Sequence, residues 1–206
     1  DASAGIWELA IPEATFFEGN QAQAGSDHSE NGNSCFVTGN SNIESNPGYD
    51  DIDGGKTTLF SPVYDLSEYS GVIVSYWKWY TNNQGNNPGT DNWQVDISSD
   101  GGNSWINLDY TNQSNSYWKF NQFLINDFIE DLTNQIQFRF IANDLYNNGD
   151  QGTGGSLVEA AIDDFSIDVF VDNQCTLGDL NQDGVINIQD VVLIISACLG
   201  LIEIDE

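Results

Sequence analysis

Up to Val171 the sequence alternates between short apolar runs and polar clusters that favour turns. The runs are rich in aromatic and β-branched residues, and the clusters are rich in Gly, Asn, Asp and Ser. This pattern is typical of β-strands joined by turns. The strands that it predicts are Ile6–Ile11, Ser34–Thr38, Thr57–Phe60, Val72–Tyr80, Trp93–Ser98, Trp105–Tyr110, Trp118–Leu124, Gln135–Ala142, Leu157–Ile162 and Phe165–Val171. Their spacing predicts an all-β fold, an antiparallel β-sandwich of the jelly-roll type, with Asn82–Thr90 and Asn143–Gly155 as its longest loops.

The pattern changes near the C-terminus. After the linker Asp172–Gln174, apolar residues recur with the helical period of about 3.6 instead of two. This change predicts a helix over Val191–Leu199. We therefore predict two domains, a jelly-roll β-sandwich over residues 1–172 and a small loop-helix module over residues 173–206.

The stretch Asp179–Asp190 has the spacing of a calcium-binding loop. Oxygen-bearing side chains stand at positions one, three, five, nine and twelve, with Gly184 at position six. These are the positions of an EF-hand loop, in which position seven donates a backbone carbonyl. Ca²⁺ prefers hard oxygen ligands, and glycine permits the left-handed backbone of the turn. The sequence therefore predicts a Ca²⁺ site formed by Asp179, Asn181, Asp183, Val185, Asn187 and Asp190.

This loop resembles the calcium loop of dockerin modules. Dockerins carry Asp at the twelfth position, as Asp190 does here, where calmodulin-type loops carry Glu. The following segment Val191–Gly200 is similar to the dockerin helix with its terminal Leu-Gly. The resemblance implies calcium binding. It does not imply cohesin binding, because the chain has a single repeat where dockerins usually have two, and Ile188 and Gln189 differ from the small hydroxyl residues usual at positions ten and eleven.

Acidic residues strongly outnumber basic ones. The chain has 32 Asp and Glu against 4 Lys and Arg, which gives a formal net charge of −28. Nucleic-acid binding is excluded and binding to an anionic membrane surface is disfavoured, because both partners carry the same sign of charge. The longest apolar run, Val191–Ala197, is too short to insert into a membrane as a span. Bound divalent cations or high salt would relieve the self-repulsion, and an acidic surface adapted to saline surroundings is the alternative explanation.

The N-terminus and the cysteines indicate an exported protein. The chain begins at Asp1 without Met and shows no signal peptide, so we expect a mature, secreted form. Calcium loops of this kind fill most readily where calcium is millimolar, which favours an extracellular location. Cys175 and Cys198 flank the calcium loop and helix, and a disulfide between them would stabilise the module by ~3 kcal/mol. Cys35 is then either a buried small hydrophobe, which its apolar neighbours favour, or a partner for another chain.

Residues Ser98–Trp105 fit the Asp-box pattern, Ser-x-Asp-x-Gly-x-Ser-Trp. In this pattern the Asp caps the turn of a β-hairpin and the Trp packs beneath it. The pattern occurs in sialidases and in many proteins that are not enzymes. It therefore predicts a hairpin and says nothing of catalysis.

The sandwich resembles the non-catalytic jelly-roll domain that follows secreted bacterial zinc carboxypeptidases and immune-inhibitor-A-like peptidases, which is loosely similar to MAM domains. The resemblance covers roughly Gly5 to Val171 and is carried by Gly5–Glu8 with Asp27-His28 and Cys35–Gly39, by Asp53–Leu59 with Ser61–Ser67, by Ser75–Tyr80 and by Ser156–Phe165. It implies an accessory domain. Peptidase activity is not implied, because the zinc motifs of the peptidases are absent from this sequence.

A second Ca²⁺ site is expected in the sandwich. Jelly rolls often hold a structural Ca²⁺ where an early loop meets the last strand, and an Asp within an apolar strand is costly to bury without a partner. The residues expected at this site are Asp27, Asp50, Asp51, Asp53, Asp163 and Asp164. The alternative is that these residues are turn and cap residues that face water.

No active centre can be assembled from the sequence. His28 is the only histidine, which argues against a zinc site and leaves one candidate for a Ser-His-Asp or Cys-His arrangement. A loop histidine hydrogen-bonded near Asp27 is the better interpretation. A pair of carboxylates for glycoside hydrolysis is not excluded by the sequence, because acids are frequent and no spacing singles out two of them. We predict that the protein is not an enzyme.

Aromatic residues on the predicted strand Val72–Tyr80 form two faces. Trp77 and Trp79 share one face, and Tyr76 and Tyr80 share the other. One face must be core, and the other is a possible platform for a sugar or a neighbouring chain.

These features favour a secreted, calcium-stabilised, non-catalytic module for extracellular adhesion or assembly. The short apolar stretches Gly5–Ile11 and Leu201–Ile204 could add to the sheet edge of a neighbour, so we expect binding to further copies, in a fibre or array, or to another cell-surface protein. The alternative is a carbohydrate-binding module that is accessory to a secreted hydrolase, with polysaccharide as its partner.

Overall fold

In the computed structural model, the chain divides into two compact units, Asp1–Phe170 and Val171–Glu206. The structure describes residues 2–40, 48–49, 51–144, 155–171, 178–181 and 183–201. The first unit is built from β-strands, and the described part of the second contains a helix.

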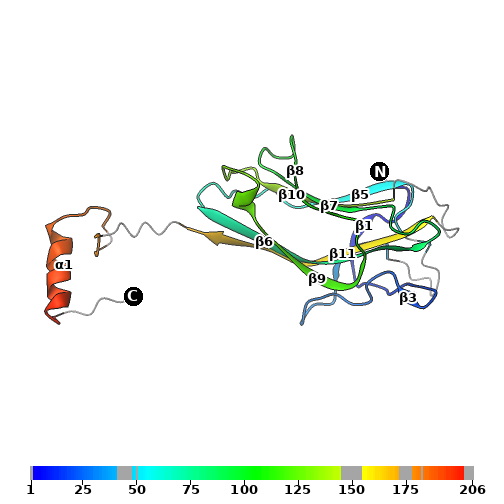
Figure 1. Ribbon diagram of the computed structural model, residues 1–206, viewed down its shortest axis with the longest axis horizontal. Coiled ribbons are helices and arrows are strands. Elements are labelled where there is room, and N and C mark those ends of the chain that lie inside the picture. The colour runs from blue at the N-terminus through cyan, green and yellow to red at the C-terminus, as the bar shows by residue number, and fades with distance from the viewer. Residues whose placement is uncertain are drawn as a thin grey trace. The chain divides into compact units, whose positions relative to one another are not determined.

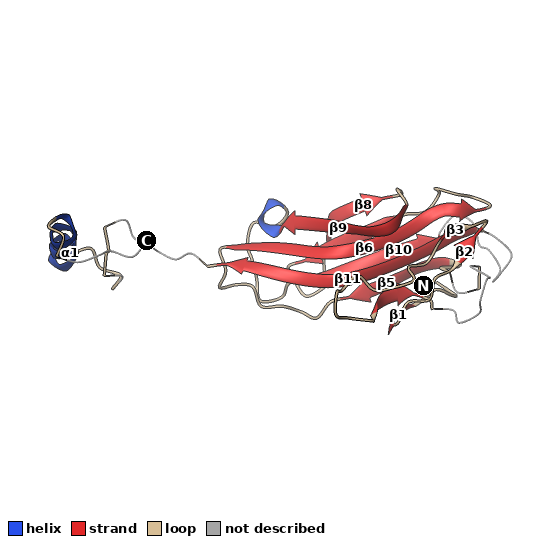
Figure 2. Ribbon diagram, turned by 90° about the horizontal axis from the view of Figure 1, so that it is seen from below, coloured by secondary structure: helices blue, strands red, loops and turns tan. Residues whose placement is uncertain are grey.

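Two antiparallel sheets make up the first unit (Figures 1 and 2). One sheet has the strand order β1 (Trp7–Ala10), β4 (Cys35–Thr38), β11 (Ser156–Phe170), β6 (Gly71–Gly85) and β9 (Asn115–Leu124). The other has the order β5 (Gly55–Phe60), β10 (Gln137–Asp144), β7 (Trp93–Ser98) and β8 (Ile106–Thr111). From β4 to β7 the chain changes sheet at every step, as in a jelly roll. The predicted antiparallel β-sandwich is confirmed.

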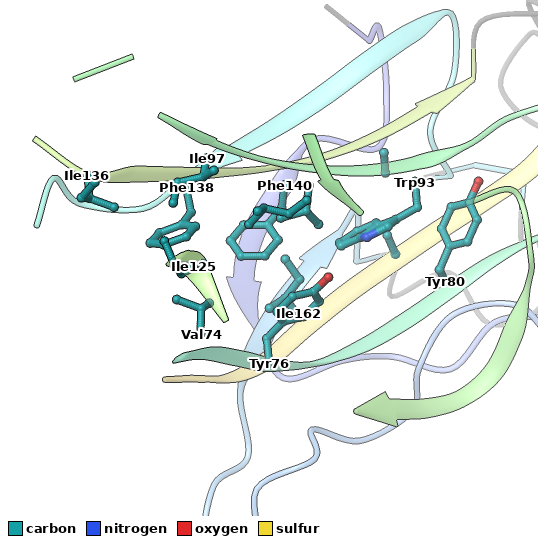
Figure 3. Packing of buried hydrophobic residues seen from close by; sticks show 14 of the residues in the cluster. Val74, Tyr76, Tyr80, Trp93, Ile97, Ile125, Ile136, Phe138, Phe140 and Ile162 are labelled. Carbon is teal, nitrogen blue, oxygen red and sulfur yellow. The ribbon is translucent and has the colours of Figure 1, made fainter. Parts of the chain in front are cut away.

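Aromatic side chains fill the space between the two sheets (Figure 3). Trp93 and Phe140 of one sheet point toward Tyr76 of the other. The ring centroids of Tyr76 and Phe140 are 5.2 Å apart, and those of Tyr76 and Trp93 are 6.5 Å apart. Tyr76 and Trp93 are fully buried. Burial of each such ring stabilises the fold by roughly 1.5–3 kcal/mol, so the sheets are a rigid support for the side chains on their outer faces.

Strand β11 is continuous where the pattern predicts two strands, Leu157–Ile162 and Phe165–Val171. Its register with β6 shifts between Asp163 and Ser166, and Asp164 has a φ of 49°. Asp tolerates left-handed backbone better than most residues, so the chain forms a bulge here and then continues the strand. The two-strand prediction is wrong, because the alternation is interrupted at the bulge while the strand continues.

Two further elements differ from the prediction. Strand β6 continues to Gly85, so the predicted loop Asn82–Thr90 begins inside a strand. A short hairpin of β2 (Phe16–Phe17) and β3 (Asn20–Gln21) was not predicted, because two-residue strands show no alternation. Its turn has positive φ at Glu18 and Gly19, as a type I′ hairpin requires. Residues 145–154 of the predicted loop Asn143–Gly155 lie outside the described residues.

In the second unit, helix α1 (Ile188–Cys198) begins three residues before the predicted helix. Asn187 caps it, since its side chain accepts a hydrogen bond from Gln189 N at 2.7 Å. Asp190 completes a capping box by accepting from Asn187 N at 2.8 Å. The cap explains the earlier start. No helix in the described ranges is long and apolar enough to cross a membrane.

Candidate functional site

The outer face of the four-stranded sheet carries a groove along the edge strand β5. Lys56, Thr58 and Phe60 alternate along β5 and therefore point to one side of the sheet. Arg139 pairs with Phe60 in the register of β10 and β5, and it points away from the core because its neighbour Phe140 points into it. The hollow measures ≈ 470 Å³ and is lined by Ala2, Ile6, Lys56, Thr57, Thr58, Phe60 and Arg139. This volume is in the usual range of ligand pockets.

The N-terminal segment forms the second wall of the groove. Ala2 N donates to Lys56 O at 2.8 Å, and Trp7 N donates to Thr57 Oγ1 at 3.3 Å. Ile6 lies between these contacts and is 64% exposed. These bonds occupy part of the edge of β5. A ligand in the groove would therefore contact side chains more than free backbone groups.

Arg139 is held from two sides. Its Nε and Nη2 atoms lie 2.8 and 2.7 Å from Asp96 Oδ2, and its guanidinium carbon lies 4.2 Å from the centre of the Trp105 ring. Asp96 is 2% exposed and also accepts from Gln94 Nε2 and Asn107 Nδ2. A planar guanidinium fixed in this way loses little freedom when it binds a ligand.

The groove has a charge opposite to that of the chain. The chain has 4 basic residues, and two of them, Lys56 and Arg139, line the hollow, whose described lining includes no acidic residue. Lys56 is exposed, and in the described ranges it makes no ion pair. Arg139 is paired with Asp96, so among the described residues Lys56 carries the unpaired positive charge of the groove, and Arg139 adds N–H donors.

On β6, one aromatic face is core, as expected, and the other face is covered, so the possible platform is not open. Tyr76 and Tyr80 are fully buried in the core between the sheets. Trp79 is on the opposite face but is only 6% exposed, because the segment after β3 covers it and Ala22 O accepts a hydrogen bond from Trp79 Nε1 at 2.7 Å. These rings are core, and a ligand has no access to them.

The fourth platform residue is covered by the segment before β4. His28 stacks on Trp77 with ring centroids 3.7 Å apart. Asp164 Oδ1 accepts from Ser29 Oγ at 2.6 Å, and its Oδ2 lies 2.7 Å from His28 Nδ1. Asp163 Oδ2 accepts from the backbone N of both loop residues, at 2.7 and 3.2 Å. The hydrogen bonds from Ser29 and His28 lower the pKa of Asp164. The two acids thus fasten this segment to the bulge of β11.

A separate cluster of buried acids lies at the end of β5. Asp51, Asp53 and Asp144 are 2%, 4% and 0% exposed, and Gly54 N donates to Asp144 Oδ2 at 3.3 Å. Burial, and then the charges of Asp53 and Asp144, raise the pKa of Asp51 to about 8. Its Oδ1 is buried and has no hydrogen-bond partner within the described residues.

The structure does not bring the described acids of the predicted sandwich calcium site together, because they fall into two groups, Asp51 with Asp53 and Asp27 with Asp163 and Asp164. Ile52 N donates to Val158 O at 3.0 Å, so Asp51 and Asp53 lie beside Val158 of β11. Val158 is five residues along the strand from Asp163, roughly 16 Å. Asp27 belongs with Asp163, and Asp50 lies outside the described residues. In the part of the chain that is described, no three Asp, Glu, His or Cys side chains form a group placed to hold a metal ion.

In the second unit, the first and last carboxylates of the predicted calcium loop close the loop. Asp179 accepts from the backbone N of Asp183 and Gly184 at 3.2 and 2.8 Å. Asp190 accepts from Asn187 N, and this bond lowers the pKa of Asp190. Asp179 and Asp190 are 4% and 1% exposed. Gly184 has a φ of 83°, the left-handed conformation expected at position six.

The other predicted ligands of this loop bond to one another. Asn181 Nδ2 donates to Asp183 Oδ2 at 2.8 Å, and Asn187 Nδ2 donates to Val185 O at 3.1 Å. Every predicted ligand offers an oxygen atom, so the chemistry of the donor set fits Ca²⁺. The carboxylates are turned onto backbone N–H groups instead of toward a common centre, so a cation would have to displace these bonds.

The cysteines are not arranged for catalysis. Cys35 is 2% exposed, which confirms its predicted burial. Burial, with the charges of Asp163 and Asp27, raises the pKa of its thiol to about 12, so it is a poor nucleophile. Cys198 is exposed and has no disulfide partner among the described residues, and Cys175 lies outside them. The bridge between these two stays a prediction.

The Asp-box residues form the turn between β7 and β8. Asp100 accepts from the N of Ser104 at 2.8 Å and from its Oγ at 2.6 Å. Trp105 Nε1 donates to Gly102 O at 3.0 Å. The predicted hairpin is confirmed, and it places the Trp105 ring under Arg139 at the groove.

Comparison with known proteins gives no family. No family model matches the sequence, and no curated protein matches it. The resemblance to the accessory domain of zinc carboxypeptidases therefore stays a prediction.

Solved structures that the chain resembles include carbohydrate-binding modules. One is TmCBM61 in complex with β-1,4-galactotriose, with a TM-score of 0.40 and 11% identity over 82% of this chain and 86% of that one. Another is a family 16 carbohydrate-binding module, with a TM-score of 0.37 and 12% identity over 68% and 79%. A third is the CBM22-1 xylan-binding domain of Paenibacillus barcinonensis Xyn10C, with a TM-score of 0.34 and 10% identity over 83% and 90%.

Sequence reasoning missed the groove. The sequence predicts strands that contain Thr58, Phe60 and Arg139, but it does not show that Lys56 and these residues share one face. A signal was present, because cationic, hydroxyl and aromatic residues alternate on one face of β5. The side of the sheet that this face lies on, and the strand beside it, come only from the fold.

Proposed function

We propose that the sandwich unit is a secreted, non-catalytic module that binds polysaccharide in the groove beside β5. The observation that carries this proposal is the ring of Phe60, which is 53% exposed, follows Thr58 on the same face of β5 and is paired with Arg139 of β10. A sugar has an apolar ring face and a rim of hydroxyl groups, so it fits an aromatic ring flanked by polar groups. The strands hold these groups in place before the ligand arrives.

The groove is suited to binding rather than to hydrolysis. Glycoside hydrolysis needs two carboxyl groups that flank the scissile bond, and the described residues that line the hollow include none. Asp96 lies behind Arg139 but is 2% exposed and paired. His28 is engaged by Asp164 and Trp77, away from β5.

Affinity electrophoresis against soluble neutral and acidic polysaccharides tests this proposal. We expect the full chain to be retarded by at least one polysaccharide and Phe60→Ala to lose most of the retardation, about tenfold in Kd, since a lost stacking contact is worth ~1.5 kcal/mol. Tyr117→Ala is the matched control, because Tyr117 is 59% exposed on the other sheet. Equal retardation of the wild type and Phe60→Ala would contradict the proposal.

We also propose that the second unit holds Ca²⁺ through Asp179, Asn181, Asp183, Val185, Asn187 and Asp190. The support is the all-oxygen donor set at EF-hand spacing, with Gly184 in the left-handed conformation. A unit of fewer than about 40 residues rarely has enough core to fold alone. The bound cation would offset part of that deficit and part of the negative charge.

A second candidate function, assembly with further copies, is favoured by the surface of α1. Ile188, Val192, Ile195 and Leu199 lie along one side of the helix and are 72%, 54%, 52% and 67% exposed. Asp190, which is buried, is the only charged residue in this helix. A stripe of this kind is typical of a helix that packs against another apolar surface.

A further inference from the structure

We infer that the groove beside β5 takes the acidic units of a polysaccharide, sugar rings that carry a carboxylate such as uronates. This inference rests on the proposed polysaccharide binding and names its ligand class. It follows from the two cations, the aromatic ring and the absence of acids that the described lining of the groove combines.

The composition of the lining is the first support. The chain has 32 acidic and 4 basic residues, yet the described lining has two basic residues and no acidic one. A site for neutral sugars needs neither charge, and desolvating an ammonium group against a neutral ligand costs free energy. The lining is therefore matched to a ligand with negative charge.

The geometry of Arg139 leaves it able to bind an anion. A guanidinium has five N–H donors, and both of its contacts with Asp96 are made to a single oxygen, Oδ2. The side chain of Arg139 remains 23% exposed. Trp105 supports the guanidinium plane from one side, so the remaining donors have a fixed orientation. A ligand carboxylate could accept from them with little loss of side-chain entropy.

Lys56 supplies a second positive charge further along the same face. Lys56 pairs with Asn143 in the register of β5 and β10, and Phe60 pairs with Arg139. The two cations are therefore four strand residues apart, roughly 13 Å. This spacing is between backbone positions, and Arg139 is held by Asp96 and Trp105, so the two side chains do not converge on one carboxylate. This separation suits a chain of sugars, in which different rings present their carboxylates to the two residues.

An acidic polysaccharide fits better than an acidic peptide. A peptide that adds to a sheet edge needs free backbone groups, and Ala2 N already occupies Lys56 O. Phe60 lies beside Arg139 in the register of β5 and β10, and its exposed ring could stack on a sugar ring. At physiological ionic strength the Debye length is about 8 Å, so acids beyond that distance repel the ligand weakly. The nearer acids are Asp96, which is paired with Arg139, and the buried cluster at the end of β5.

Isothermal titration of the full chain with short oligogalacturonates tests this inference. The comparison ligand is the carboxyl-reduced oligosaccharide of the same length, and polyglutamate serves as a charged ligand without sugar rings. We expect the acidic oligosaccharide to bind at least about tenfold more tightly than its reduced form, because a hydrogen bond to a charged group is worth ~1.5–3 kcal/mol.

Two variants isolate the charge. Lys56→Gln should weaken binding of the acidic oligosaccharide by about tenfold and leave binding of the reduced one unchanged, and Lys56→Arg should restore the affinity. Lys119→Gln removes the same charge from an exposed position on β9 and should change neither.

The outcomes separate the two proposals. Equal affinity for the acidic and reduced oligosaccharides, an equal loss in Lys119→Gln, or equally tight binding of polyglutamate would each overturn the inference while polysaccharide binding stands. Binding of no oligosaccharide or polysaccharide at all would overturn both.

Discussion

A single buried carboxyl group ties the stability of the sandwich to pH. Asp51 has a pKa of about 8 in the folded chain, because it is buried beside Asp53 and Asp144, whereas the ordinary value is about 3.9. Between these values the folded state holds a proton that the unfolded state has released. The contribution of Asp51 to stability is therefore fully present below about pH 4 and is lost as the pH rises through about 8.

Replacing Asp51 by Asn should stabilise the protein at alkaline pH. The amide side chain of this variant keeps an oxygen acceptor, cannot ionise, and can donate to the neighbouring carboxylates. In the presence of a chelator, we expect the Tm of Asp51→Asn at pH 9 to exceed that of the wild type by on the order of 5–10 °C. At pH 4 we expect the two Tm values to differ little. Thermal unfolding between pH 4 and pH 9 measures this. If the difference in Tm between the variant and the wild type did not grow with pH, the raised pKa of Asp51 would be refuted.

Asp100 of the Asp-box is a control for Asp51, because its pKa is shifted in the opposite direction. Hydrogen bonds from Ser104 and Ser98 lower the pKa of Asp100 to about 2. Its contribution to stability is present above about pH 4 and is lost as the pH falls through about 2. Asp100→Asn should therefore lower Tm at neutral pH, and this loss should shrink as the pH falls toward 2. If both variants showed the same pH dependence, a general charge effect would explain them better than the local contacts.

At the scale of elements, the sequence predicts strands well and sites poorly. Strands β4, β5 and β7 follow from alternation alone, because that pattern is local. The bulge at Asp163 depends on the contacts that Asp163 and Asp164 make with a segment about 135 residues earlier. The groove depends on pairing β5 with β10, and the buried faces of β6 depend on which segments cover them. Such long-range pairings are set by tertiary packing, which no local pattern contains.

The loop before α1 contains the residues that we propose as Ca²⁺ ligands. We expect Asp179→Ala combined with Asp183→Ala to remove one calcium equivalent in isothermal titration and to lower the helical signal of α1 in circular dichroism. The reason is that Asp179 supplies an oxygen and also accepts from two backbone N–H groups of the loop. Glu130→Ala with Asp131→Ala removes the same charge from exposed sites in the first unit. Undiminished calcium stoichiometry in the loop variant would refute the ligand assignment.

At the scale of the whole molecule, charge and exposed apolar surface oppose each other. A formal net charge of −28 keeps copies apart. The helix α1 offers Ile188, Val192, Ile195 and Leu199 to solvent, spaced by four, three and four residues, on a surface without exposed charge. Association through this stripe buries apolar surface, and because the stripe carries no charged side chain, no like charges meet at the contact. Association competes with the repulsion between the net negative charges of two copies. Bound Ca²⁺ neutralises part of that charge and therefore favours association.

Sedimentation velocity of the full chain over a range of concentrations tests this balance. In saturating calcium we expect the weight-average sedimentation coefficient to rise with concentration, and in EGTA we expect it to stay at the monomer value. Val192→Gln combined with Ile195→Gln should abolish the rise, since two buried aliphatic side chains are worth ~3–6 kcal/mol at an interface. Val63→Gln is the control, because Val63 is 51% exposed in the first unit. A monomer at high concentration in saturating calcium would show that the stripe does not pair copies of this chain and would leave polysaccharide binding as the function that the structure supports.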